Sequence, residues 1–136
     1  MKAEATFAVK TFEPADVSLE PSITTALPVG VAVMTKHFDG DAAGRATTVF
    51  TAAFDQSSGV GTYVAMESFE GTLNGRRGTF NFAHSATTTG TDRTGEYFTI
   101  VPGSGTGELT GISGTGGLTV DDDGTHRIRF DYELKP

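Results

Sequence analysis

The 136-residue sequence contains no cysteine and no tryptophan, and it has 10 lysines and arginines against 17 aspartates and glutamates. Without cysteine the chain can form no disulfide, thiol nucleophile, iron–sulfur cluster or thiolate-ligated zinc site. The net charge of −7 argues against nucleic acid and anionic membranes as partners, because both select a basic face. The one basic pair, Arg76-Arg77, adjoins a turn and is interpreted as a solvated loop.

Long apolar runs are absent as well. No stretch approaches the roughly 18 residues that a membrane helix needs, and residues 1–7 lack the apolar core of a signal peptide. We therefore expect a soluble protein in the cytoplasm, with residues 1–136 forming one domain.

The residues that are abundant favour an all-β chain. Eighteen glycines suit tight turns, the many threonines suit strands, and apolar residues nowhere follow a helical period. Ten phenylalanines can supply the core, since each fully buried one contributes roughly 1.5–3 kcal/mol.

Alternation of apolar and polar residues predicts eight strands with short connections. Between the first two, residues 13–28 contain Pro14, Pro21 and Pro28, which predict an ordered loop with room for one short helical turn. Regular strand spacing of this kind favours an antiparallel barrel or sandwich over parallel units. The predicted strands lie at about 3–12, 29–38, 45–54, 60–73, 76–88, 94–101, 112–120 and 125–134.

The dipeptide Asn74-Gly75 predicts a two-residue type I′ turn, because both of its central positions require positive φ. Such a turn fixes the register of the flanking strands and places an aromatic face opposite a mostly polar one. The predicted pairs on the aromatic face are Phe69 with Phe80, Glu67 with Phe82, Ala65 with His84, and Tyr63 with Ala86.

The last hairpin follows the same logic. A three-residue loop at 122–124 aligns Val120 with His126 and Leu118 with Ile128, and it places Gly124 in a left-handed position. The final strand then directs four residues inward, namely Ile128, Phe130, Tyr132 and Leu134.

Glu67 and His84 are the best candidates for chemistry, because the register places both on the apolar face within reach of each other. A carboxylate among phenylalanines should have a raised pKa unless His84 or another donor compensates for its burial. The pair would then be a catalytic acid and base, or alternatively a structural pair that fixes strand register. The candidate ligand-binding residues are Tyr63, Phe69, Phe80, Phe82 and His37.

Other motifs predict structure. The run 103–107 (GSGTG) lacks the lysine and helix of a phosphate loop and is interpreted as a turn, and 121–124 (DDDG) lacks the ligand spacing of an EF-hand. The three histidines show no metal-binding spacing, so we expect no metal and no cofactor. Residues 71–79 and 107–115 share the pattern G-x-L-x-G-x-x-G-T, which suggests one hairpin type used twice.

Several of these motifs resemble an uncharacterised bacterial family, domain-of-unknown-function family 3224. The resemblance rests on residues 38–41 with Gly44, on 67–80, on His84-Ser85 and above all on 101–111. The family is similar to plant allene oxide cyclase, which implies an eight-stranded antiparallel barrel. No catalytic residue of that cyclase maps onto this sequence, so its activity is not carried over.

Three functions remain open. The barrel could bind a small, largely apolar molecule in its interior, or it could be a small isomerase, cyclase or lyase that uses Glu67 and His84. It could also be filled by side chains and serve only for interaction, since eight strands enclose space for side chains or one small ligand. Because a closed barrel has no free edge, we expect any assembly, such as a homodimer, to use the outer faces or the 13–28 loop.

Overall fold

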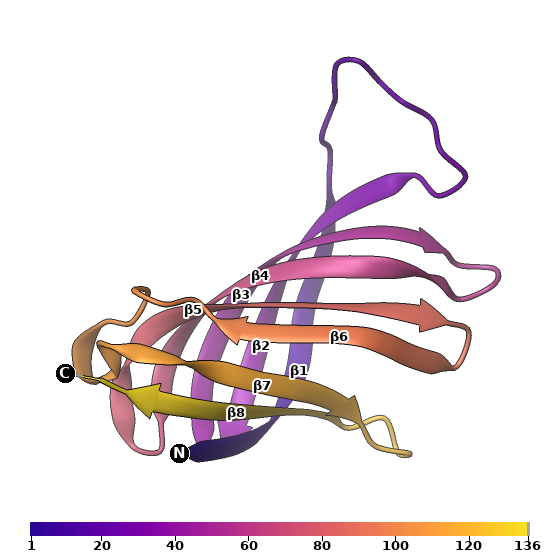
Figure 1. Ribbon diagram of the computed structural model, residues 1–136. Coiled ribbons are helices and arrows are strands. Elements are labelled where there is room, and N and C mark those ends of the chain that lie inside the picture. Colours follow the sequence, from indigo (N-terminus) through magenta and orange to yellow (C-terminus); the bar gives the residue numbers. More distant parts are fainter. Residues whose placement is uncertain (136) are drawn as a thin grey trace.

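The computed structural model describes residues 1–135, which form eight antiparallel strands closed into one barrel (Figure 1). Each strand pairs with the next along the chain, and β1 closes the ring on β8. The predicted all-β barrel is therefore confirmed. No helix in the described residues is long and apolar enough to cross a membrane. The elements are β1 (Lys2–Ala15), β2 (Val29–Gly40), β3 (Ala42–Asp55), β4 (Val60–Leu73), β5 (Arg76–Thr89), β6 (Asp92–Ile100), the single 3₁₀ turn η1 (Gly107–Leu109), β7 (Ile112–Val120) and β8 (His126–Leu134).

Strand β1 runs farther than its sequence predicts, through Pro14, which lies opposite Ala32 of β2. The pairing of β1 with β8 ends at Phe7 and His126, so Pro14 lies where β1 has no neighbour on its other side. A proline is tolerated at such an edge because no ladder bond is lost there. Residues 16–28 contain no helix, so the short helical turn considered for this segment does not form, and the loop extends beyond the barrel (Figure 1).

The β4–β5 hairpin has the predicted turn and register. Asn74 and Gly75 have φ of 48° and 83°, and the predicted pairs on the aromatic face all occur. The Asn74 side chain also donates hydrogen bonds to the Lys2 carbonyl (3.0 Å) and the Tyr132 hydroxyl (2.7 Å). The turn thus ties β4 and β5 to β1 and β8 at one end of the barrel.

The β7–β8 hairpin also has its predicted register, with Val120 opposite His126 and a φ of 88° at Gly124. Asp121 accepts a hydrogen bond from Arg127 Nε at 2.7 Å. The acidic run 121–123 therefore belongs to an exposed turn with its own ion pair.

The second copy of the repeated pattern does not form a hairpin, so that prediction is wrong. Residues 107–109 form the 3₁₀ turn η1, and Glu108 Oε1 accepts a hydrogen bond from the Arg77 backbone N–H at 3.1 Å. The difference follows from the turn residues, because the second copy has Thr110-Gly111 in place of Asn74-Gly75. The two copies pack against each other instead.

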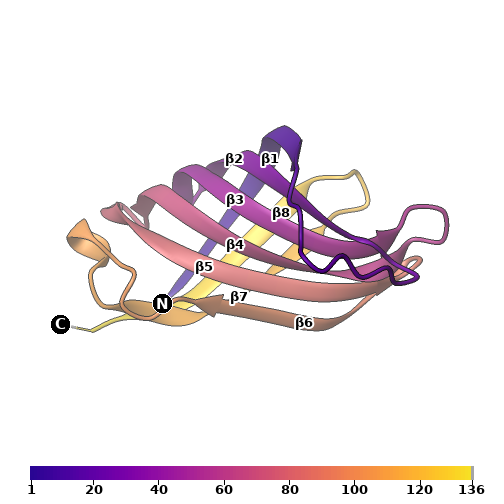
Figure 2. The ribbon, with the colours of Figure 1, turned by 90° about the horizontal axis from the view of Figure 1, so that it is seen from above.

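The glycine-rich run 103–107 is a connection, as the sequence predicts. It follows the edge of β5, where Ser104 Oγ accepts a hydrogen bond from the Asn81 backbone N–H at 3.0 Å. Because the chain follows β5 here, β6 and β7 are joined by one ladder pair, Ile100 with Gly114, and they diverge beyond it (Figures 1 and 2).

The interior has two different halves. The filled half lies at the end that holds the β4–β5 turn, and its side chains are fully buried and mostly aromatic. The open half lies toward the loops 16–28, 56–59, 90–91 and 121–125. Polar side chains of β2, β4 and β5 lie at the boundary between the halves. The larger residues of the hydrophobic core are Phe38, Phe69, Leu73, Phe80, Phe82, Phe98, Ile100, Leu109, Ile112, Ile128, Phe130 and Tyr132.

Candidate functional site

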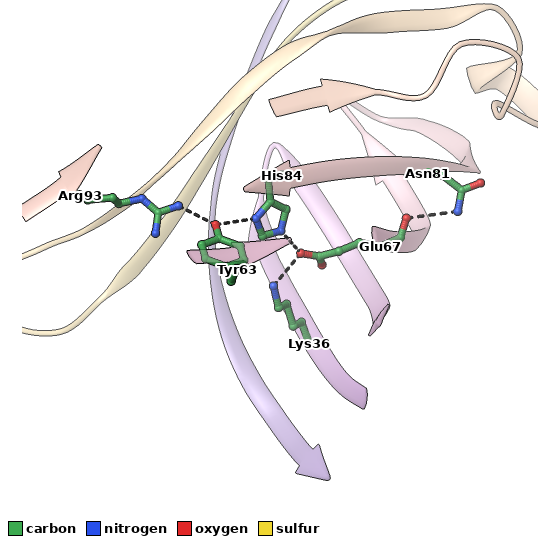
Figure 3. A network of polar contacts seen from close by, with 6 residues as sticks. All are labelled: Lys36, Tyr63, Glu67, Asn81, His84 and Arg93. Atoms are coloured by element: carbon green, nitrogen blue, oxygen red, sulfur yellow. Dashed lines mark hydrogen bonds and ion pairs between the residues drawn. The ribbon is translucent and has the colours of Figure 1, made fainter. Parts of the chain in front are cut away.

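Five side chains form a connected polar cluster at the boundary between the two halves (Figure 3). Tyr63 and Glu67 come from β4, and His84 comes from β5, where it lies opposite Ala65. Lys36 reaches them from β2 and Arg93 from β6. Strand alternation directs the first four inward, and we call the five residues the polar cluster.

Glu67 is the most enclosed member, with no exposed surface. Its Oε2 accepts hydrogen bonds from Lys36 Nζ at 2.7 Å and from His84 Nε2 at 2.5 Å. The other oxygen, Oε1, has no hydrogen-bond partner within residues 1–135, and neither has Thr48 Oγ1 on the facing position of β3. Two polar atoms without partners therefore lie beside the buried ion pair.

Burial alone would raise the pKa of Glu67, but the hydrogen bond from His84 and the positive charge of Lys36 outweigh it and lower that pKa. The sequence predicts a raised pKa only where such donors are missing, and two are present. Glu67 is thus held as a carboxylate.

A chain of hydrogen bonds leads from Glu67 through His84 to Tyr63 and Arg93 (Figure 3). Arg93 donates to the Tyr63 hydroxyl at 2.6 Å, and that hydroxyl lies 2.8 Å from His84 Nδ1. Because a guanidinium can only donate, the Tyr63 oxygen accepts from Arg93 and its proton is directed to Nδ1. A neutral His84 then carries its own proton on Nε2, which donates to Glu67.

Burial raises the pKa of the Tyr63 hydroxyl, and the hydrogen bond and charge of Arg93 offset part of that effect. The phenol therefore keeps its proton at neutral pH. Burial lowers the pKa of Arg93, but its hydrogen bond to Tyr63 and its pairing with Glu96 outweigh this and raise it. The tyrosine remains a donor and the arginine remains a cation.

The open half contains a cavity of about 220 Å³, which we call the mouth cavity. Its floor includes Lys36, Tyr63 and His84, with Arg93 and His126 at the sides. Glu67 lies behind this floor and does not line the cavity. The apolar walls are formed by Phe7, Val9, Met34, Phe50, Leu118 and Val120.

The structure brings Glu67, His84 and Tyr63 together as the register predicts, but it separates the other candidates from the cavity. Phe69, Phe80 and Phe82 are buried in the filled half and do not line the mouth cavity. Phe82 instead stacks against His84, with ring centroids 5.9 Å apart, so it supports the histidine.

His37 is the clear correction. It is exposed on the outer face, where it lines a hollow with Arg45 and Glu70, so its expected place in an interior site is wrong. The reason is strand alternation, because its neighbours Lys36 and Phe38 both point inward.

Sequence reasoning missed Lys36 and Arg93. Lys36 shares its face with Ala32, Met34 and Phe38, so the alternation of β2 could have identified it as a buried cation. Arg93 gives no such signal, because a register shift between Ser85 and Thr87 moves the pairing of β6 against β5. Within residues 1–135 no group of three His, Cys, Asp or Glu side chains could hold a metal ion.

The fold and the site define a small closed barrel with a polar cluster between a packed core and an open mouth. A family model for proteins of unknown function, DUF3224, matches residues 3–132, and the chain belongs to this family. A solved structure of a protein with unknown function from the DUF3224 family of Shewanella oneidensis MR-1 is similar, with 29% sequence identity and a TM-score of 0.85. The match covers 100% of this chain and 98% of that one.

No curated protein matches this chain. The resemblance to allene oxide cyclase is not tested by these comparisons and remains a prediction.

Proposed function

We propose that this protein binds a small, largely apolar molecule in the mouth cavity. The observation that carries the proposal is the combination of six apolar wall residues with hydrogen-bond donors grouped at the floor. Ligand sites are commonly apolar hollows in which a few placed polar groups fix the orientation of the ligand. The mouth of a small barrel is a common position for such a site.

The cavity volume limits the size of the ligand. At about 220 Å³ it is smaller than the roughly 300–1,000 Å³ of pockets that enclose drug-sized molecules. A compact ligand, such as one or two fused rings or a short branched chain, fits this space better than a long acyl chain.

The lining also limits the polar group of the ligand. Lys36, His84, Arg93 and His126 line the cavity, but no aspartate or glutamate does, although the chain as a whole is acidic. Lys36 Nζ carries three N–H donors, and Glu67 is its only hydrogen-bond acceptor in the described part of the chain. Such a floor favours a carbonyl, carboxylate or other acceptor on the ligand over a cationic group.

Native mass spectrometry of gently purified protein tests the proposal. We expect a retained small molecule, and Val9→Trp should abolish retention because the indole fills the mouth. Val60→Trp is the matched control, since Val60 lies on the outer face of β4, does not line the cavity and is 39% exposed against 42% for Val9. Equal loss from both variants, or a wild type that never carries or takes up a small molecule, would contradict the proposal.

A second candidate function is a small isomerase, cyclase or lyase that uses Glu67 and His84 as acid and base. The hydrogen-bond chain from Glu67 to Tyr63 favours it. Glu67, however, does not line the cavity, so it would act through His84. The third candidate is a side-chain-filled barrel that serves only for interaction. The packed core of the filled half agrees with it, but the cavity in the open half favours ligand binding.

The proposal includes a homodimer and a cytoplasmic location. Val33, Val49 and Met66 are neighbours across β2, β3 and β4, all exposed, and form an apolar row on the outer face. A second copy of the chain could cover this row about a two-fold axis, since such an interface uses the same patch on both subunits. Cell fractionation tests the location.

A further inference from the structure

Both ring nitrogens of His84 are occupied, which determines how a proton can reach it. Nε2 faces Glu67 Oε2, and Nδ1 faces the Tyr63 hydroxyl at 2.8 Å. Phe82 stacks on one side of the ring at 5.9 Å, and only 5% of the histidine is exposed. A proton from the cavity therefore reaches His84 through the Tyr63 oxygen.

Tyr63 connects His84 to the mouth cavity. It lines the mouth cavity, and its ring stacks on Phe50 with centroids 5.4 Å apart. Its oxygen accepts from Arg93, directs its proton to His84 Nδ1 and retains one lone pair. The tyrosine is thus held on two sides and open to the cavity.

We propose that Tyr63 is a catalytic residue that relays a proton between His84 and a small enolisable ketone or aldehyde bound in the mouth cavity. This activity rests on the proposed binding function. It requires no cofactor, because the reaction is a proton abstraction and return without change of oxidation state.

The C–H bond next to the carbonyl breaks, its electron pair forms the C=C bond of an enolate, and the carbonyl π pair moves to oxygen. The substrate proton passes to the Tyr63 oxygen while the proton of that hydroxyl passes to His84 Nδ1. The resulting imidazolium is stabilised by Glu67, and the proton returns by the same route to the same or a conjugated carbon.

Two cations at the cavity stabilise the enolate. Lys36 lines the cavity, and its Nζ has N–H donors that Glu67 does not use; Arg93 also lines the cavity and donates to the Tyr63 hydroxyl. In this scheme the substrate C–H contacts Tyr63, His84 takes the proton through Tyr63, and Glu67 acts through His84 by stabilising the imidazolium. This arrangement explains why a carboxylate with no exposed surface is connected to the cavity at all.

The experiment follows exchange of the α-protons of 2-tetralone in D₂O by ¹H NMR, with binding monitored in the same samples by saturation transfer. We expect the wild type to bind 2-tetralone and to accelerate exchange above the buffer rate. Tyr63→Phe should still bind it but lose about 100-fold or more of the acceleration, the usual contribution of a positioned acid or base. His84→Gln should behave in the same way.

Tyr97→Phe is the matched control, because Tyr97 is 59% exposed and does not line the mouth cavity. It should leave both binding and exchange unchanged. If the wild type binds 2-tetralone without accelerating exchange, or Tyr63→Phe keeps the wild-type rate, the relay is overturned and the binding function stands. If 2-tetralone does not bind, the carbonyl class is overturned, and native mass spectrometry decides the binding function separately.

Discussion

The filled and open halves of the barrel are built from the same strands, but they differ in what their inward positions carry. In the filled half those positions hold phenylalanines such as Phe80, which packs against both Phe69 and Phe130. In the open half, β2 carries Met34 where its filled half has Phe38, and β4 carries Tyr63 where its filled half has Phe69, and a cavity remains. Strands β4 and β5 thus contribute both to the packed core and to the lining of the mouth cavity, because alternation fixes the direction of a side chain and not its size.

The largest effect should come from removing a ring in the filled half. Phe80→Ala deletes a side chain packed against Phe69, Phe82 and Phe130, and should lower the free energy of unfolding by about 3–5 kcal/mol. Phe50→Ala removes a half-buried ring of the open half and should cost clearly less. Urea unfolding followed by circular dichroism measures both. Equal losses would show that the two halves do not differ in packing.

The buried carboxylate at the boundary between the halves should make the free energy of unfolding sensitive to acid. Because the pKa of Glu67 is lowered by folding, its contribution is fully present above its ordinary value of 4.5 and is lost as the pH falls through the lowered pKa. Glu67→Gln should cost about 1–3 kcal/mol at neutral pH and lose this difference from the wild type in acid. Unfolding free energies measured from neutral pH downward test the prediction.

Glu70→Gln is the control for that experiment. Glu70 forms an exposed pair with Arg45 at 3.0 Å, and removing an exposed pair costs at most about 1 kcal/mol. If the unfolding free energy of Glu67→Gln ran parallel to that of the wild type at all pH values, the ionised Glu67 would not be the cause of the acid sensitivity.

The turn that closes the filled half should tolerate only residues with positive φ. Gly75→Val forces a β-branched residue to a φ of 83° and should cost about 1–3 kcal/mol. No atom would lie within 4 Å of the added Cβ at Gly75 or at Gly30, so neither change is opposed by crowding. Gly30→Val, at a position without positive φ, should therefore leave the thermal midpoint nearly unchanged, and a matching drop in both would refute the conformational cause.

The smallest effect concerns the outer face, which the two halves share. Val49→Lys places a charge at the centre of the apolar row of Val33, Val49 and Met66, and should shift the proposed dimer toward monomer without altering the unfolding midpoint at low concentration. Sedimentation at micromolar concentration measures the shift. A wild type that sediments as a monomer would count against the dimer.

Turn chemistry made the fold predictable to the level of single residues. Asn74-Gly75 sets the register of β4 against β5, and 122–124 sets that of β7 against β8, so Glu67 and His84 could be placed together in advance. His37 differs from its predicted place because residue type gives no direction to a side chain, and alternation with Lys36 and Phe38 directs it outward. Arg93 depends on a register shift within the β5–β6 pair, which local sequence does not encode.

The single ladder pair between β6 and β7 has a consequence for how the chain folds. Strands β1–β6 form a meander of consecutive hairpins, and β7–β8 form another, so most pairing is local and should form early. The ring closes only when β8 adds to β1, where residues from opposite ends of the chain meet. This step closes the longest loop, so the chain loses the most conformational entropy there. We expect Ile128→Val, on the β8 face that meets β1, to speed unfolding and leave the folding rate nearly unchanged in stopped-flow measurements.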